Sequence, residues 1–278
     1  MEEKPTQPLQ LRVLGFCGAD DSVSPELLIL LSQNYPFVEW GILFRPDLEG
    51  TPRYASWDWT TRLCHLVAQA SPVSNHKLNS NPRKMRLAAH LCGSRCQDVL
   101  DGNSKFVSDL KNLGFGRVQV NATKANNVTI NPTMIAETVQ NIRKCMEAVP
   151  TIEWILQYNE ETRCICDSFL LKPEPNMSIL YDSSCGLGIQ MKEFPKPVNP
   201  DILYGYAGGI GPRTIKEMLS KIQQISQGTG VWIDMETSLR TKVIGEAGSA
   251  EDVFSIEKCF ECIMIASDSL GIPRLIHE

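Results

Sequence analysis

Two adjacent glycines, Gly208 and Gly209, separate an apolar run from a helical pattern in the segment YGYAGGIGPRTIKEML (204–219). Glycines at such a junction leave backbone N–H groups open to an anion at the start of a helix, or they form a turn that needs a positive φ. Thiol and carboxyl groups can transfer protons, and a guanidinium can hold a carboxylate. Such groups close or follow several other apolar runs, at Cys17, Arg53, Tyr54, Gln119, Asn121, Asp182, Asp234 and Glu236.

The chain alternates short apolar runs with amphipathic helical patterns. The predicted strands are residues 11–17, 37–44, 84–92, 115–121, 151–158, 177–184, 202–208 and 230–236. The predicted helices are residues 24–34, 56–70, 104–114, 132–149, 160–171, 212–226 and 250–267. Ser24 and Ser56 are their clearest N-caps. Only the sixth strand is followed mainly by a loop, the proline-rich segment FPKPVNP.

Alternating strands and helices predict a parallel sheet. Eight such units in about 250 residues favour an α/β fold of one domain, the (β/α)8 TIM barrel, over a doubly wound sheet. We expect the barrel to span residues 11–278 behind a flexible N-terminal tail, residues 1–10. Active sites of such barrels lie at the C-terminal ends of the strands, and phosphate binds after strands seven and eight. This rule gathers the polar side chains on one face and favours phosphate binding at Gly208 and Gly209.

The composition is that of an ordinary globular protein, with 42% hydrophobic and 21% charged residues. The net charge of −5 argues against a nucleic-acid partner. No apolar run approaches the ~18 residues that cross a bilayer, and the polar N-terminus has no signal-peptide core. We therefore expect a cytoplasmic monomer or homodimer that binds neither nucleic acid nor membrane.

Ten cysteines are a high number for 278 residues. Most stand in apolar segments, which predicts reduced, buried thiols rather than disulfides. Cys259 and Cys262 have a C-x-x-C spacing without a partner pair, and HLCGSRC places His90 near Cys92 and Cys96. A structural zinc site needs four ligands, and no fourth is evident. The sequence therefore calls for no metal and no other cofactor.

Six segments together resemble the phosphoribosylanthranilate isomerases. In chain order they are FCGADD, VEWGILFRPDLEGTPRYAS, VQVN, ILYDSSCGLGIQ, YAGGIGPRTIKEML and IDMETSLRT, which run from the first strand to the eighth. The resemblance implies an aldose–ketose isomerase of tryptophan biosynthesis. Enzymes of this family carry out the Amadori rearrangement of an N-ribosyl anthranilate phosphate, so the expected partner is a small phosphorylated or carboxylated metabolite.

The resemblance also implies roles for individual residues. Cys17 would be the base and Asp182 the acid, which requires a thiol pKa lowered from about 8.5 and a carboxyl pKa raised from about 3.9. Arg53 would clamp the anthranilate carboxylate. Gln119, Asn121, Gly186 and Gly188 would line the substrate site, and Gly208, Gly209, Thr237 and Ser238 would bind phosphate. We expect Asp234 to be structural.

Some positions depart from the family pattern. Gly15 stands where the family has a lysine, and Asn121 replaces a histidine. Glu236 precedes Thr237 and Ser238 where small residues complete the phosphate cup, and its charge would repel a phosphate dianion. Three hypotheses remain: a phosphoribosylanthranilate isomerase, a diverged barrel enzyme acting on another sugar phosphate or carboxylated metabolite, and a non-catalytic relative that binds a ligand or partner.

Overall fold

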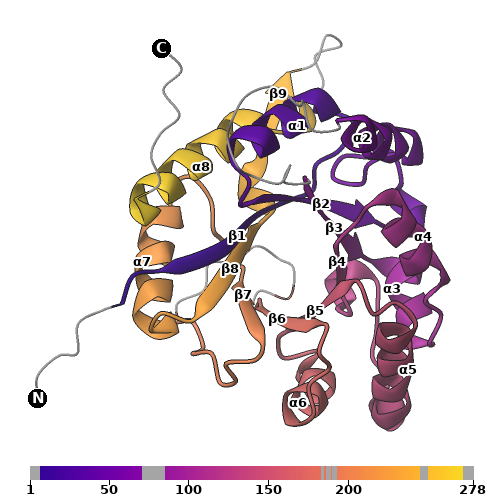
Figure 1. The fold of residues 1–278 in the computed structure, drawn as a ribbon. Coiled ribbons are helices and arrows are strands. Elements are labelled where there is room, and N and C mark those ends of the chain that lie inside the picture. Colours follow the sequence, from indigo (N-terminus) through magenta and orange to yellow (C-terminus); the bar gives the residue numbers. More distant parts are fainter. Residues whose placement is uncertain are drawn as a thin grey trace, which may run out of the picture.

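Eight parallel strands close into a barrel in the order β1 to β8 (Figure 1). The computed structural model describes residues 7–70, 85–182, 185, 189, 193–244 and 250–271. The barrel strands are β1 Gln10–Cys17, β2 Val38–Phe44, β3 Arg86–Leu91, β4 Arg117–Val120, β5 Glu153–Tyr158, β6 Met177–Tyr181, β7 Leu203–Tyr206 and β8 Gly230–Met235. All eight predicted strands are present, and the predicted single-domain (β/α)8 barrel is confirmed.

Helices surround this barrel on its outside (Figure 1). They are α1 Pro25–Asn34, α2 Trp57–Gln69, α3 Gly93–Leu100, α4 Lys105–Leu113, α5 Ile135–Ala148, α6 Arg163–Leu171, α7 Ile215–Ser226 and α8 Ile256–Leu270. The predicted cap of α2 is formed, since Ser56 Oγ accepts a hydrogen bond from the Trp59 N–H. Gly114 ends α4 with a φ of 103°, as its position at the C-terminus predicts. None of the described helices is long and apolar enough to cross a membrane.

The predicted helix over residues 250–267 is wrong in its first part. Residues Ala250–Phe254 form a strand, β10, which pairs antiparallel with β9, Arg240–Ile244. Helix α8 begins only at Ile256, because Ser255 Oγ accepts from the Lys258 N–H and caps it there. A side chain fixes the hairpin of β9 and β10: Arg240 donates to the Gly18 and Asp252 carbonyls. These are long-range contacts, which a helical pattern in sequence does not contain.

The short helix α3 was also not predicted. It begins inside the segment HLCGSRC, whose spacing of histidine and cysteines resembles that of metal ligands. Its cysteines are buried and free, as are most of the ten; Cys164 is exposed and Cys185 is half-buried. The expectation that most of these thiols are buried is therefore confirmed.

Trp232 fills the half of the barrel interior that lies toward the N-terminal ends of the strands. Its ring packs with Val13, Ile155, Leu180 and Ala207, and the Arg117 guanidinium lies 4.1 Å from its ring centre. Arg117 in turn forms buried ion pairs with carboxylates of β2 and β5, at 2.7 and 2.8 Å. Because this half is filled, the cavity described below lies at the C-terminal ends of the strands.

Gly205 makes room for Trp232. A Cβ at position 205 would lie 2.1 Å from Trp232 Cε2, which is far inside van der Waals contact. We predict that Gly205→Ala lowers the free energy of unfolding by about 1–3 kcal/mol or more, because the enclosed indole cannot move away. Urea unfolding followed by circular dichroism measures this change.

Gly116→Ala is the matched control, since a Cβ at position 116 would meet no atom within 4 Å. Its unfolding free energy should stay unchanged or rise by up to about 1 kcal/mol. If both variants lost the same free energy of unfolding, a clash with Trp232 would not explain the loss in Gly205→Ala.

Candidate functional site

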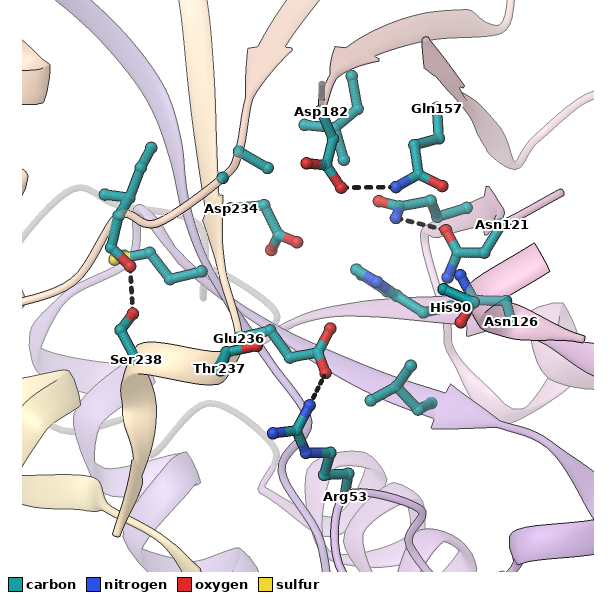
Figure 2. A pocket seen from close by; sticks show the side chains of 18 of the residues that line it. Arg53, His90, Asn121, Asn126, Gln157, Asp182, Asp234, Glu236, Thr237 and Ser238 are labelled. Atoms are coloured by element: carbon teal, nitrogen blue, oxygen red, sulfur yellow. Dashed lines mark hydrogen bonds and ion pairs between the residues drawn. The ribbon is translucent and has the colours of Figure 1, made fainter. Parts of the chain in front are cut away.

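A cavity of about 230 Å³ opens at the C-terminal ends of the strands, where barrel active sites occur (Figure 2). Its polar lining comes from six of the eight strands or the loops that follow them. The polar side chains are Arg53, Tyr54, His90, Gln119, Asn121, Asn126, Gln157, Asp182, Asp234, Glu236, Thr237 and Ser238. Three carboxyl groups face one guanidinium in this set, so the cavity is acidic.

The structure brings most of the predicted site residues to this cavity. Those that line it are Arg53, Gln119, Asn121, Asp182, Gly208, Gly209, Thr237 and Ser238. Gly186 and Gly188 lie outside the described residues. Cys17 ends β1 beside the site, but it is completely buried and does not belong to the cavity wall.

Asp182 follows β6 and is held in the cavity wall by a neighbouring amide. Gln157 Nε2 donates to Asp182 Oδ2 at 2.7 Å. The other amide atom, Gln157 Oε1, is buried and has no hydrogen-bond partner among the described residues, and the same holds for Gln119 Oε1. Because unpaired buried acceptors are costly, both oxygens are suited to accept hydrogen bonds from the hydroxyl groups of a bound ligand.

Cys17, His90 and Asp234 form a buried cluster that the sequence did not predict. Cys17 Sγ lies 3.2 Å from His90 Nδ1, and a ligand atom of each of the three residues lies within 4.8 Å of the other two. The sequence spacing had grouped His90 with Cys92 and Cys96 instead. No local pattern gives this cluster, because its members come from three strands, β1, β3 and β8, which are brought together by strand register.

The environment of this cluster favours the uncharged forms of its groups. Burial raises the pKa of the Cys17 thiol well above 9.0, and the Glu236 and Asp234 carboxylates raise it further. Burial, followed by the Glu236 charge, also raises the pKa of Asp234 well above 3.8. Burial lowers the pKa of His90 to about 3, with a smaller effect of Arg117. Cys17 therefore does not meet the requirement for a lowered thiol pKa in this structure.

Arg53 faces an internal carboxylate at the mouth of the cavity. Its Nη1 lies 3.0 Å from Glu236 Oε1 (Figure 2). The backbone of Arg53 has a φ of 79°, which is unusual for a residue with a side chain. Its N–H donates to Asp20 Oδ2 at 2.6 Å, and the same oxygen accepts from Arg240 Nη1 at 2.7 Å. The predicted carboxylate clamp is thus held in place and paired with Glu236.

The glycine loop after β7 has the features of half an anion site. Gly208 and Gly209 have φ values of 98° and 66°, and neither N–H donates a hydrogen bond to another described residue. Helix α7 begins at Ile215, three residues later than predicted, and in the preceding turn the Gly211 N–H donates to Thr214 Oγ1 at 3.0 Å. Glycine is required at both positions by the positive φ, and the free N–H groups are left to face the cavity.

The segment after β8 does not complete this anion site in the same way. Ser238 Oγ donates to the Ile210 carbonyl and is therefore already committed. Glu236 is the neighbouring side chain, and burial raises its pKa while Arg53 lowers it. Thr237 is exposed. The two halves predicted for phosphate therefore differ: Ser238 Oγ is committed and Glu236 lies beside it, whereas the glycine loop contains no such carboxylate.

The chain has no matching family and only distant structural neighbours. No protein-family profile matches it, and no curated protein does. Among solved structures it is similar to monomers of dimeric phosphoribosylanthranilate isomerase from Thermotoga maritima, at 12% identity and a TM-score of 0.48, over 94% of this chain and 100% of that one. It is also similar to N-acetylneuraminate lyase from Mycoplasma synoviae, at 12% identity and a TM-score of 0.43, over 82% and 69% of the two chains. Likenesses of this degree do not bear on the chemistry of the site.

The burial of Cys17 predicts a thiol that reagents do not reach. In the folded protein at pH 8, iodoacetamide should alkylate Cys164, which is exposed, and leave Cys17 unmodified. The raised thiol pKa acts in the same direction, because only the thiolate reacts and its fraction stays negligible below that pKa. Peptide mass spectrometry before and after denaturation in urea measures both sites.

Cys17 should become alkylated once urea has unfolded the chain, which controls for the reactivity of its peptide. Alkylation of Cys17 in the folded protein at a rate like that of Cys164 would contradict the placement of its thiol behind the cavity wall.

Proposed function

We propose that this protein is a barrel isomerase that transfers protons on a small polar metabolite, the class of reaction that phosphoribosylanthranilate isomerases catalyse. The observation that carries the proposal is Asp182, a carboxyl group in the cavity wall at the end of β6, positioned by Gln157 at 2.7 Å. A carboxyl group in this position can act as the general acid that protonates a ring oxygen as a sugar ring opens. The free acceptors of Gln119 and Gln157 suit sugar hydroxyl groups.

The second proton-transfer role is assigned to Cys17 by the resemblance in sequence. In this chain the thiol has no direct access to the cavity, but His90 contacts it at 3.2 Å and lines the cavity. In the metal-free protein Cys17 would act through His90, whose ring would exchange the proton with the substrate carbon; a metal ion bound to both groups would exclude this route. This route keeps the two roles on different strands, β3 and β6, on either side of the cavity.

The phosphoribosylanthranilate-type substrate sets two further demands. Its phosphate would bind the N–H groups of Gly208 and Gly209, and its carboxylate would bind Arg53. The first contact requires the Glu236 carboxylate to turn away from the phosphate, and the second requires Arg53 to leave Glu236. A carboxylate left ~4 Å from a phosphate costs about 1 kcal/mol in water and several times more in a shielded site.

A second candidate follows from the same ion pair. The contact of Arg53 with Glu236 neutralises the only guanidinium on the cavity wall among the described residues. Asp182 and Asp234 add acidic groups. This arrangement favours a polyhydroxylated substrate without phosphate, handled by the same proton-transfer groups, and thus a diverged enzyme rather than a phosphoribosylanthranilate isomerase.

The Asp182→Asn variant tests the proposed reaction class. We expect it to lower kcat/KM by about 10²–10⁴, because an amide cannot supply the proton while it still accepts the Gln157 hydrogen bond. The assay follows the fluorescence of the anthranilate group, with phosphoribosylanthranilate and with N-ribosylanthranilate as separate substrates. Asp201→Asn, in an exposed loop, is the control and should keep full activity.

Turnover of phosphoribosylanthranilate would favour the first candidate, and turnover of only the unphosphorylated compound would favour the second. If the wild-type protein converts neither compound, or if Asp182→Asn keeps wild-type activity, the isomerase proposal fails.

The Glu236→Gln variant tests the anion end of the cavity separately. We expect inorganic phosphate to bind at least about fivefold more tightly, since removing a unit charge ~4 Å away is worth about 1 kcal/mol even in water. The change also removes the nearer of two carboxylates paired with Arg53 and leaves Asp252, whose Oδ2 lies 3.8 Å from Arg53 Nε. Isothermal titration calorimetry measures the affinity, and Glu251→Gln, an exposed change on β10, should leave it unaltered. An unchanged affinity in Glu236→Gln would show that Glu236 does not block an anion site.

A further inference from the structure

Three potential metal ligands meet at the upper end of the barrel interior. Cys17 comes from β1, His90 from β3 and Asp234 from β8, and all three are buried. Their ligand atoms lie within 4.8 Å of one another, and Cys17 Sγ and His90 Nδ1 are 3.2 Å apart. Zinc bonds of about 2.0–2.3 Å in a tetrahedron separate the ligand atoms by roughly 3.3–3.7 Å. The cluster therefore has nearly the dimensions of a zinc site.

We propose that Cys17, His90 and Asp234 bind one Zn²⁺ ion and leave a fourth coordination position facing the cavity. The inference goes beyond the proposed isomerase function, and the sequence alone calls for no metal. Three protein ligands with one open position are the arrangement of catalytic rather than structural zinc.

The types of ligand favour zinc over other common ions. Magnesium and calcium prefer oxygen ligands, and in this cluster only Asp234 offers oxygen atoms. A thiolate, an imidazole and a carboxylate together suit Zn²⁺. Asp234 forms no ion pair with any lysine or arginine in the described part of the chain. A divalent cation would supply the positive charge that a buried thiolate and carboxylate need.

The position of the cavity explains how an ion would reach the cluster. His90 and Asp234 line the cavity, and their side chains point into it (Figure 2). Cys17 lies behind them and is 0% exposed. A nucleophile must touch its substrate, which Cys17 cannot do from there, whereas a metal ligand needs only to reach the ion. The open coordination position would lie on the cavity side, where substrate binds.

Two glycines allow the three side chains to converge. A Cβ at Gly15 would lie 2.6 Å from Asp234 Oδ1, and a Cβ at Gly41 would lie 2.8 Å from His90 Nε2. Any larger residue at these positions would displace a ligand. Gly15 is also the position where the resembling family has a lysine, whose side chain would bring a competing positive charge into this space.

Cobalt provides the test, because Co²⁺ takes zinc sites and reports its ligands by absorption. The purified full-length chain is first analysed for zinc, then stripped with a chelator and titrated with Co²⁺. We expect one equivalent to bind, with a thiolate-to-cobalt charge-transfer band in the near ultraviolet and visible bands typical of tetrahedral cobalt. Zn²⁺ should displace the cobalt and abolish these bands.

Variants of the cluster then assign the ligands. Cys17→Ser should lose the charge-transfer band, and Asp234→Asn should keep the band but bind Co²⁺ more weakly. Each loss of affinity should exceed the about 10–100-fold cost of losing an outer-shell partner. Cys145→Ser is the control, since Cys145 is equally buried but lies on α5, and it should behave as wild type. Far-ultraviolet circular dichroism shows whether each variant is folded.

The proposal is overturned if the stripped, folded wild-type chain binds less than about a tenth of an equivalent of Co²⁺ and Zn²⁺ under conditions that load ordinary zinc sites. It is also overturned by any one of three results: bound cobalt shows no thiolate band, Cys145→Ser removes that band, or Asp234→Asn binds Co²⁺ with wild-type affinity. These measurements do not use isomerase activity, so they stand whether or not the proposed reaction is found.

Discussion

The parallel pairing of β1 with β8 is the contact on which the site depends. This ladder sets Gly15 opposite Asp234 and Phe16 opposite Met235, although the two strands come from opposite ends of the chain. In an open sheet of eight strands spaced about 4.8 Å apart, the first and last strands would be roughly 30 Å apart. Closure of the barrel brings Cys17 and Asp234 into one cluster, and the pairing of β2 with β1 and β3 brings His90 to the same place.

The interior of the barrel is divided into a filled half and an open half. In the N-terminal half, Trp232 occupies the space that Gly205 leaves free, Arg117 stacks on its ring, and the carboxylates of Glu39 and Glu153 neutralise the guanidinium. In the open half, the glycines at positions 15 and 41 accept polar side chains against their backbones. Burying so many polar groups is costly unless they are paired. The unpaired amide oxygens of Gln119 and Gln157 are therefore concentrated where a ligand can satisfy them.

The charges at the mouth of the cavity set its choice of ligand. Arg240 joins the β9–β10 hairpin to the segment after β1, and Asp20 links this contact to the backbone of Arg53. Arg53 is held with a strained φ and directed toward Glu236. An anionic substrate must compete with that internal carboxylate, while a neutral substrate or a cation meets no such obstacle. The glycine loop after β7 offers N–H groups that suit an anion, whereas the Glu236 carboxylate on the other side of the mouth repels one.

The sequence by itself determined the barrel and the face on which the site lies. Strand and helix periodicities are local, and the order of eight βα units leaves few ways to close a sheet, so all eight strands and most of the predicted pocket residues were found from sequence. Residues such as Asp182 and Gly208 were predicted because each immediately follows a strand. Only the tertiary structure decided which side chains meet. Cys17, His90 and Asp234 are grouped by strand register and by missing side chains at Gly15 and Gly41, and Glu236 is paired with Arg53 across the mouth of the cavity. The hairpin of β9 and β10 was missed for the same reason, because its pairing and its contact with Arg240 join residues whose proximity no local pattern specifies.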